Sequence, residues 1–228
     1  MARRNPAVQA FTLYLLVLVL GPILTQGQTV PGALRITRLE YGGGGDWYAD
    51  PSSLPNLIDY ASRQTGMTIV SDEARAAIGD DTFWRSTYFY MTGHGNIHLS
   101  QEEASILRSH LLAGAFLHAD DNYGMDQAFR REMKKVFPDK DFVELSPDHP
   151  IFQIVFPFPD GLPKIHEHDG KPPQGLGLFH EGQLVVFYTY ECDLGDGWED
   201  PDVHEVPPNL REAALKMGTN IIVYALSR

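Results

Sequence analysis

The chain has 228 residues, a formal net charge of −12 at pH 7 and one cysteine, Cys192. Because the phosphate backbone repels an acidic protein, we expect no nucleic-acid partner. The single cysteine excludes an intrachain disulfide, so the hydrophobic core must supply the stability.

The N-terminal residues have the pattern of a secretory signal peptide. Arg3 and Arg4 precede an apolar run over residues 11–24, which is too short for a membrane-spanning helix. We therefore expect a signal peptide at residues 1–27 and a single mature α/β domain at residues 28–228. The mature protein is then periplasmic or secreted, without stable membrane insertion after cleavage, and its formal charge becomes −14 once both arginines leave.

The first part of the mature chain predicts two strands and a helix. Residues 34–41 alternate apolar and polar side chains, which is typical of a strand with one partly hydrated face. Glycines at 42–45 end it, and Ser53 then precedes apolar residues at helical spacing. A short strand is expected at residues 67–70, followed by a helical or irregular connector at residues 72–78.

Residues 87–121 predict a parallel β–α–β unit. Residues 87–91 form an aromatic, β-prone run that ends in glycines. Ser100 and Glu103 have the spacing of a capping box, which begins a helix. The apolar residues 115–119 form the next strand, so the loops after both strands should meet at one edge of the sheet.

Residues after 121 predict one more helix and a hairpin. The helix begins at Asp126, with that residue as its N-cap, and ends before Pro138, and a strand follows at residues 142–145. Residues 157–175 are rich in proline, glycine and charge, which indicates a surface segment. Residues 176–190 read as two strands joined by a tight turn.

The C-terminal segment allows two interpretations. Asn209 and Glu212 have the spacing of a capping box, and apolar residues then recur at helical spacing to the C-terminus. Gly218 weakens a helix, so a helix that ends there and a strand from Asn220 is the alternative. The alternation of strands and helices predicts a three-layer α/β fold, with a mostly parallel sheet and a late antiparallel hairpin.

Acidic residues and a histidine gather where the predicted strands end, the edge at which open parallel sheets bind ligands. They are Asp46, His94, Asp120, Asp121, Glu191 and Asp193. Trp47, Tyr123 and Trp198 lie beside them, and they can either cover a sugar or peptide ligand or anchor the loops to the core. We predict a ligand site at this edge that includes Trp47, Trp198 and the six polar residues.

Three kinds of chemistry compete at this edge. Imidazole and carboxylate ligands suit zinc or manganese, and the candidates are His94, Asp120 and Asp121, with His118 or His149 as a further ligand. The sequence His166-Glu167-His168 can bind a metal too, but its charged surroundings favour a solvated loop.

Acid–base catalysis by Asp120 with Asp121, or by either with Glu191, is the second alternative. Nucleophilic catalysis by Cys192 is disfavoured, because adjacent carboxylates raise the pKa of a thiol, and a packed thiol is the better interpretation.

Several motifs recur in a characteristic order: GGGDWY at 43–48, TGHG at 92–95, LAGAFLHADD at 112–121, PDHPIF at 147–152, and DLG with WE at 193–199. This combination resembles the family called domain of unknown function 4159 and covers nearly all of the mature chain. The resemblance implies a flavodoxin-like sheet similar to that of class I glutamine amidotransferases. It does not imply amidotransferase activity, because the equivalent strand end at residues 117–121 has no cysteine.

Two functions agree with these observations. The first is an exported, non-catalytic domain that binds a small polar ligand or a cell-envelope protein at the strand-end edge. Some relatives carry this domain on longer membrane-anchored proteins, which implies a role in the envelope. The second is a metal-dependent hydrolase that uses His94, Asp120 and Asp121.

Overall fold

The computed structural model describes residues 33–228, and the signal peptide predicted at residues 1–27 lies outside them. The elements are β1 (Ile36–Glu40), α1 (Ser53–Thr65), β2 (Ala74–Ala77), α2 (Asp81–Arg85), β3 (Tyr88–Gly93), α3 (Gln101–Leu112), β4 (Phe116–Asp121), α4 (Asp126–Val136), β5 (Val143–Glu144), the 3-10 helix η1 (Pro150–Phe152), β6 (Gln174–His180), β7 (Gln183–Tyr190), α5 (Leu194–Trp198) and α6 (Pro208–Ser227). None of the helices in this part of the chain is long and apolar enough to span a membrane.

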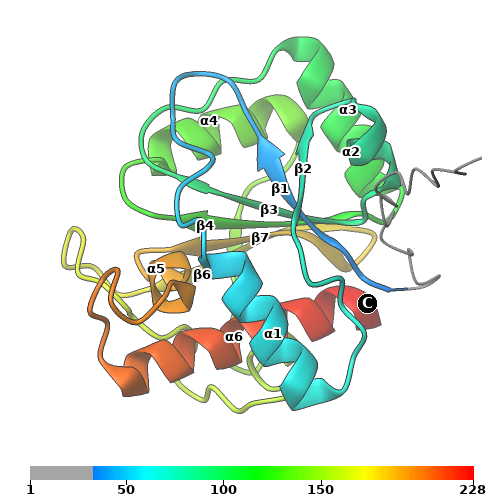
Figure 1. Cartoon of the computed structure of the whole chain (residues 1–228). Helices are drawn as coiled ribbons and strands as arrows, with labels where there is room; N and C mark the ends of the chain where they lie inside the picture. Colours follow the sequence, from blue (N-terminus) through cyan, green and yellow to red (C-terminus); the bar gives the residue numbers. More distant parts are fainter. Residues whose placement is uncertain (1–32) are drawn as a thin grey trace, which may run out of the picture. The chain divides into compact units, whose positions relative to one another are not determined.

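A seven-stranded sheet forms the middle layer, in the order β2-β1-β3-β4-β7-β6-β5 (Figure 1). The five strands from β2 to β7 are parallel, and β6 and β5 continue the sheet antiparallel to them. The order of the parallel strands is the one found in flavodoxin-like sheets. The predicted α/β fold and its late hairpin are therefore confirmed.

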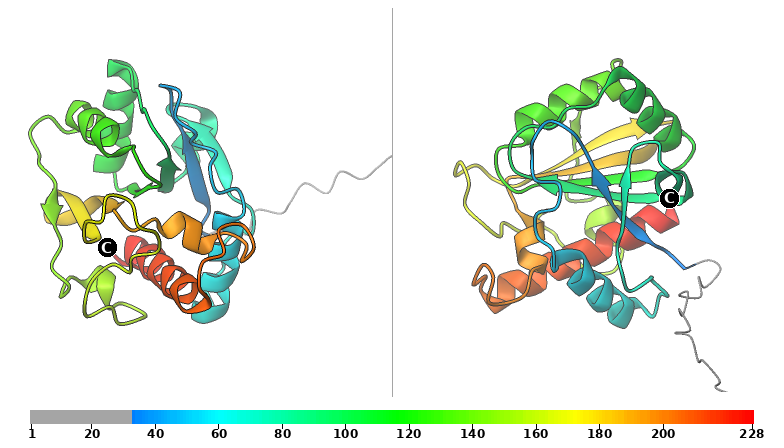
Figure 2. Two further views of the ribbon diagram at one scale, coloured as in Figure 1. Left: turned by 90° about the vertical axis from the view of Figure 1, so that its left-hand side faces the viewer. Right: turned by 45° about the horizontal axis from the view of Figure 1, so that its top comes forward.

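Helices cover both faces of the sheet, and each face has its own hydrophobic core. Helices α2, α3 and α4 lie on one face, and α1, α5 and α6 lie on the other, as Figure 2 also shows. All six residues of β3 and of β4 are buried, because neighbouring side chains point to opposite faces and both faces are covered. The burial of both strands explains why residues 87–91 and 115–119 have the sequence pattern of buried strands.

The capping box of α3 is confirmed. The Ser100 hydroxyl accepts from the Glu103 backbone N–H at 3.1 Å, and the Glu103 carboxylate accepts from the Ser100 N–H at 2.7 Å. Asp126 is the first residue of α4 and not its N-cap. Asp121 accepts instead from the backbone N–H of Tyr123 and of Met125, each at 3.1 Å, and so stabilises the turn that leads into α4.

The predicted second strand was misplaced. Ile69 makes only an isolated bridge to Leu34, whereas β2 lies in the predicted connector and runs parallel to β1. The sequence of β2 is Ala-Arg-Ala-Ala, which has low β-propensity, so its pairing follows from packing at the edge of the sheet. Helix α2 was not predicted either.

Helix α1 begins without a side-chain cap of its own. The Glu199 carboxylate supplies it from far along the chain, since Oε1 accepts from the backbone N–H of Ser52 at 2.7 Å and of Ser53 at 3.0 Å. The Asn56 side chain donates to the Trp198 carbonyl at 2.9 Å. The N-terminus of α1 is therefore tied to the end of α5.

Helix α6 is continuous from Pro208 to Ser227, so the alternative with a strand from Asn220 is wrong. It has no side-chain cap, and the capping box predicted at Asn209 does not form. Gly218 allows close packing inside the helix, because a Cβ there would lie 2.5 Å from Leu57 Cδ1 and 2.9 Å from Trp198 Cζ2. The glycine reflects the approach of α1, α5 and α6.

We expect Gly218→Ala to destabilise the protein, although alanine favours helices more than glycine does. The added methyl overpacks the contact with Leu57 and Trp198, which should lower the free energy of unfolding by about 1–3 kcal/mol in urea denaturation. Ser105→Ala, at an exposed position of α3, is the control and should cost less than about 0.5 kcal/mol. A Gly218→Ala protein as stable as the parent would contradict the close packing.

Candidate functional site

The carboxyl ends of β1, β3, β4 and β7 lie at one edge of the sheet, because these strands are parallel. Strand β6 runs antiparallel to β7, with Gln174 opposite Tyr190, so β6 begins at the same edge. The segment before β6 therefore meets the loops that follow β1, β4 and β7. This arrangement brings histidines and carboxylates together.

Two histidines from the segment before β6 contact two aspartates that follow β7. His168 Nε2 lies 3.1 Å from Asp193 Oδ2, and His166 Nδ1 lies 2.6 Å from Asp196 Oδ2 and 3.6 Å from Asp193 Oδ2. The His168 side chain is only 6% exposed. The prediction of a solvated loop at His166-Glu167-His168 was thus wrong, because the hairpin folds this segment onto α5.

Asp50 and His204 complete the group on the other side of Asp196. His204 Nε2 lies 3.2 Å from Asp196 Oδ1. We call the following six residues the His–Asp cluster: Asp50, His166, His168, Asp193, Asp196 and His204. Within it, the ligand atoms of His166, Asp193 and Asp196 all lie within 4.8 Å of one another, and so do those of Asp50, Asp196 and His204. Either set can hold a metal ion.

The carboxylates of this cluster ionise unequally. Burial raises the pKa of Asp50 to about 6 and the pKa of Asp196 to about 8, and the nearby charge of Asp193 adds to both shifts. Burial also opposes ionisation of Asp193, but its contacts with His166 and His168 outweigh burial and lower its pKa. Asp193 is 3% exposed, and its Oδ1 atom has no hydrogen-bond partner among residues 33–228. A buried carboxylate oxygen of this kind is an open ligand position.

Arg38 fixes the loop that carries Asp50. It is fully buried, and its guanidinium donates to the carbonyls of Ala49 at 2.7 Å and of Asp50 at 3.2 Å while pairing with Glu73 at 3.0 Å. The hydrated face predicted for β1 is therefore wrong, because a buried ion pair occupies it. The Asn122 side chain donates to Asp50 Oδ2 at 2.6 Å and orients the carboxylate.

A cavity of about 320 Å³ lies beside the His–Asp cluster. It is lined by Asp121, Tyr123, Gly124, Asp126, Gln127, Asp169, Lys171, Tyr190 and Glu191. The Tyr123 ring packs against the His168 ring, with 5.0 Å between centroids, and connects the cavity to the cluster. Two of the predicted ligand-binding residues, Asp121 and Glu191, line this cavity, and Glu191 also pairs with Lys164 at 3.1 Å.

The trio predicted to bind metal does not come together. His94, Asp120 and Asp121 are not among the described groups whose ligand atoms lie within 4.8 Å of one another. Asp120 and Asp121 are neighbours on β4, so they point to opposite faces of the sheet. Asp120 is fully buried and accepts from the Gly195 N–H at 2.7 Å, whereas exposed His94 pairs with Asp46 at 3.0 Å. In this structure the three residues therefore do not form one set of metal ligands.

The remaining residues considered in the sequence contact the core or neighbouring side chains of the fold. Trp198 is fully buried, and its indole N–H donates to the Ala214 carbonyl at 2.8 Å, so it anchors the core. Trp47 is half-buried, with the Arg75 guanidinium 5.9 Å from its ring centroid. Cys192 is fully buried, and burial raises the pKa of its thiol.

The two further histidine candidates also lie away from the cluster's ligand groups. His118 is fully buried in β4, where its Nε2 lies 3.1 Å from the Thr189 hydroxyl and its ring packs beside Phe187 and Trp198. Burial lowers the pKa of His118 to about 3. His149 caps η1 by accepting from the Ile151 N–H at 3.3 Å.

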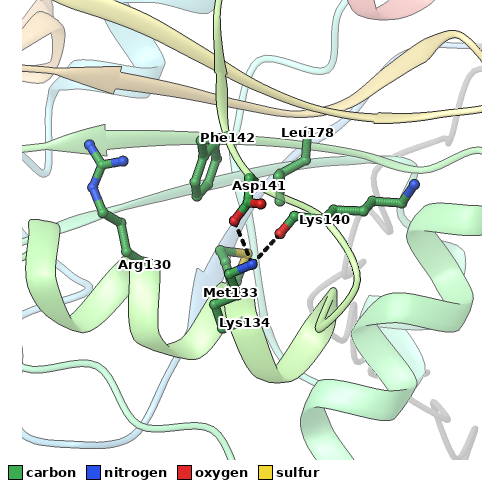
Figure 3. Close-up of a pocket in the computed structure, with 7 residues that line it drawn as sticks. All are labelled: Arg130, Met133, Lys134, Lys140, Asp141, Phe142 and Leu178. Atoms are coloured by element: carbon green, nitrogen blue, oxygen red, sulfur yellow. Dashed lines mark hydrogen bonds and ion pairs between the residues drawn. The ribbon is translucent and has the colours of Figure 1, made fainter.

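A second cavity, of about 230 Å³, lies between α4 and the segment that leads to β5 (Figure 3). Its polar groups already satisfy one another, since Lys134 donates to the Lys140 carbonyl at 2.7 Å and pairs with Asp141 at 2.6 Å. Met133, Phe142 and Leu178 form its apolar wall. None of its lining residues is among the described residues that have a buried polar atom without a hydrogen-bond partner, whereas Asp193 and His168 of the cluster are.

Sequence reasoning found Asp193 but missed Asp50, Asp196, His204 and Arg38. Asp196 and His204 follow the last strand of the parallel sheet, a position that the strand-end rule could have included. Asp50 lies at the end of the loop after β1, beyond the Asp46 that was chosen. No local pattern indicated that Arg38 is buried.

The fold and the cluster define an α/β protein with a group of histidines and carboxylates at the carboxyl edge of a parallel sheet. The profile of the family described as Domain of unknown function (DUF4159) matches residues 35–226, and the chain belongs to this family. The resemblance found in the sequence is therefore confirmed. A search of curated protein sequences gives no match.

We expect Arg38→Met to be strongly destabilising. It leaves Glu73 without its buried partner and the carbonyls before α1 without donors, so the free energy of unfolding in urea should fall by about 3 kcal/mol. Arg35→Met, at an exposed position of the same chain segment, is the matched control and should change it by less than about 0.5 kcal/mol. Equal effects of the two substitutions would argue against a structural role for the Arg38 ion pair.

His118 should make the protein acid-sensitive. Its pKa is about 3 in the folded protein and about 6.5 in the unfolded chain, so only the unfolded chain takes up the proton between these values. The free energy of unfolding should thus fall as the pH drops below 6.5. In His118→Gln, the loss between pH 7 and pH 4 should be smaller by about 3 kcal/mol. His180→Gln is the control, because His180 is half-buried. Parallel pH profiles of the parent and His118→Gln would show that His118 does not cause the acid sensitivity.

Proposed function

We propose that this chain is a divalent-metal-binding domain that holds a zinc or manganese ion between His166, Asp193 and Asp196. The observation that carries the proposal is the convergence of ligand atoms of His166, Asp193 and Asp196 within 4.8 Å of one another. The buried Oδ1 of Asp193 also has no hydrogen-bond partner among residues 33–228. One imidazole and two carboxylates are ligands that both metals accept.

The surroundings of these ligands support the proposal. His168 Nε2–H donates to Asp193 Oδ2 at 3.1 Å, which orients the carboxylate as outer-shell partners orient the ligands of known metal sites. Metal binding would also offset the repulsion between the buried Asp193 and Asp196 carboxylates. Without a cation, burial and that repulsion raise the pKa of Asp196, and the contacts with histidines offset the repulsion.

The adjacent cavity supports a small polar ligand bound beside the metal ion. Four carboxylates, one lysine and two tyrosines line its roughly 320 Å³, which offers hydrogen bonds and aromatic surface together. A polar side chain of a cell-envelope protein could occupy the same cavity instead, because it would make the same hydrogen bonds. Hydrolysis at the metal ion is the second candidate function, favoured by this space next to an ion that can lower the pKa of bound water.

The location of the protein belongs to the same proposal. The signal peptide predicted at residues 1–27 supports export, so the metal ion would be acquired in the periplasm or outside the cell.

We expect the mature protein to bind zinc or manganese tightly after chelator treatment. Isothermal titration with each metal should give at least one site per chain. His166→Ala and Asp193→Asn should weaken binding at that site by more than about 100-fold, since even outer-shell partners contribute about 10–100-fold.

His94→Ala is the matched control, because His94 also pairs with an aspartate but lies outside the cluster. It should bind metal as the parent does. The proposal fails if neither metal binds the parent, or if His94→Ala loses the metal while Asp193→Asn keeps it.

A further inference from the structure

The Asp196 carboxylate faces two sets of metal ligands at once. Its Oδ2 lies 2.6 Å from His166 Nδ1, and its Oδ1 lies 3.2 Å from His204 Nε2. The two imidazole rings are 5.7 Å apart, measured between centroids. We infer that Asp196 bridges two divalent cations, the first held with His166 and Asp193 and the second with Asp50 and His204. The inference rests on the proposed function for the first ion only.

The second set of ligands is as compact as the first. The ligand atoms of Asp50, Asp196 and His204 all lie within 4.8 Å of one another. In two-metal sites the ions lie about 3.5–4 Å apart, a separation that one carboxylate can span by giving an oxygen to each ion. The second ion would therefore have two carboxylates and one imidazole, the ligand types that suit zinc or manganese.

A buried hydroxyl supplies an independent indication of a ligand on the Asp50 side. Tyr90 is fully buried, and its hydroxyl has no hydrogen-bond partner in the described part of the chain. A Cβ on Gly195 would lie 2.9 Å from this hydroxyl and 2.6 Å from Asp50 Oδ2, so both oxygens pack against Gly195 and lie near each other. A side chain at 195 would collide with both oxygens, so glycine allows them to lie there.

The charges around the cluster's carboxylates also favour bound cations. Within residues 33–228, no lysine or arginine nitrogen lies within 4.0 Å of the carboxylates of Asp50, Asp193 or Asp196, whose ion-pair partners are all histidines. Arg38 donates to the Asp50 carbonyl, but its ion-pair partner is Glu73 and not the Asp50 carboxylate. Two divalent ions would let all three buried carboxylates ionise, because a buried carboxylate needs a paired charge.

The test is the number and coupling of bound ions. The mature protein is loaded with manganese, excess metal is removed by gel filtration, and the ions per chain are measured by elemental analysis. We expect two ions in the parent, one in His204→Ala and in His204→Gln, and none in Asp196→Asn. Electron paramagnetic resonance should show spin-coupled manganese in the parent and isolated manganese in both His204 variants.

His180→Ala is the matched control, because His180 and His204 are 33% and 32% exposed and each pairs with a carboxylate. It should keep two coupled ions. One ion in the parent that His204→Ala leaves unchanged would overturn the second site but keep the first. Two uncoupled ions, or ions that persist in Asp196→Asn, would overturn the bridge. No ion in any protein would overturn the proposed function as well.

Discussion

A buried guanidinium holds together the part of the sheet on which the site depends. Arg38 lies in β1, pairs with Glu73 beside β2, and stacks its cation 5.4 Å from the Tyr90 ring centroid in β3. Burying such a charge is costly unless it is paired and hydrogen-bonded. The carbonyls of Ala49 and Asp50 satisfy that requirement, so the loop between β1 and α1 is confined to one path. An interaction inside the sheet thereby positions a carboxylate at its edge.

The parts of the fold that could be predicted are those with local patterns. The capping box at Ser100, the buried runs of β3 and β4, and the hairpin of β6 and β7 are all encoded in short stretches of sequence. Strand β2 could not be placed, because an alanine-rich edge strand forms through its pairing with β1 and not through its own propensity. Gly218 gave the wrong impression of a helix end because its role is a contact with Leu57, which lies in another helix.

The candidate site shows the same division between local and distant information. Asp193 could be found because it follows a strand, and the rule for parallel sheets applies to each strand separately. His166 and His168 could be named as possible metal ligands, but their partners could not be predicted, since these depend on the antiparallel direction of β6, which turns a polar loop toward the cluster. Asp120 was predicted as a site residue although it is not in the cluster. It follows the pattern, yet its carboxylate is used inside the protein to hold the start of α5.

The contact between Glu199 and the start of α1 has a consequence for the order in which the protein assembles. Glu199 lies 147 positions after Ser52 and 146 positions after Ser53 in the sequence. Helix α1 has no side-chain cap of its own. During synthesis, α1 leaves the ribosome long before Glu199 exists. The cap that Glu199 gives to α1 can therefore form only when nearly the whole chain has emerged, and contacts of such long sequence separation slow folding.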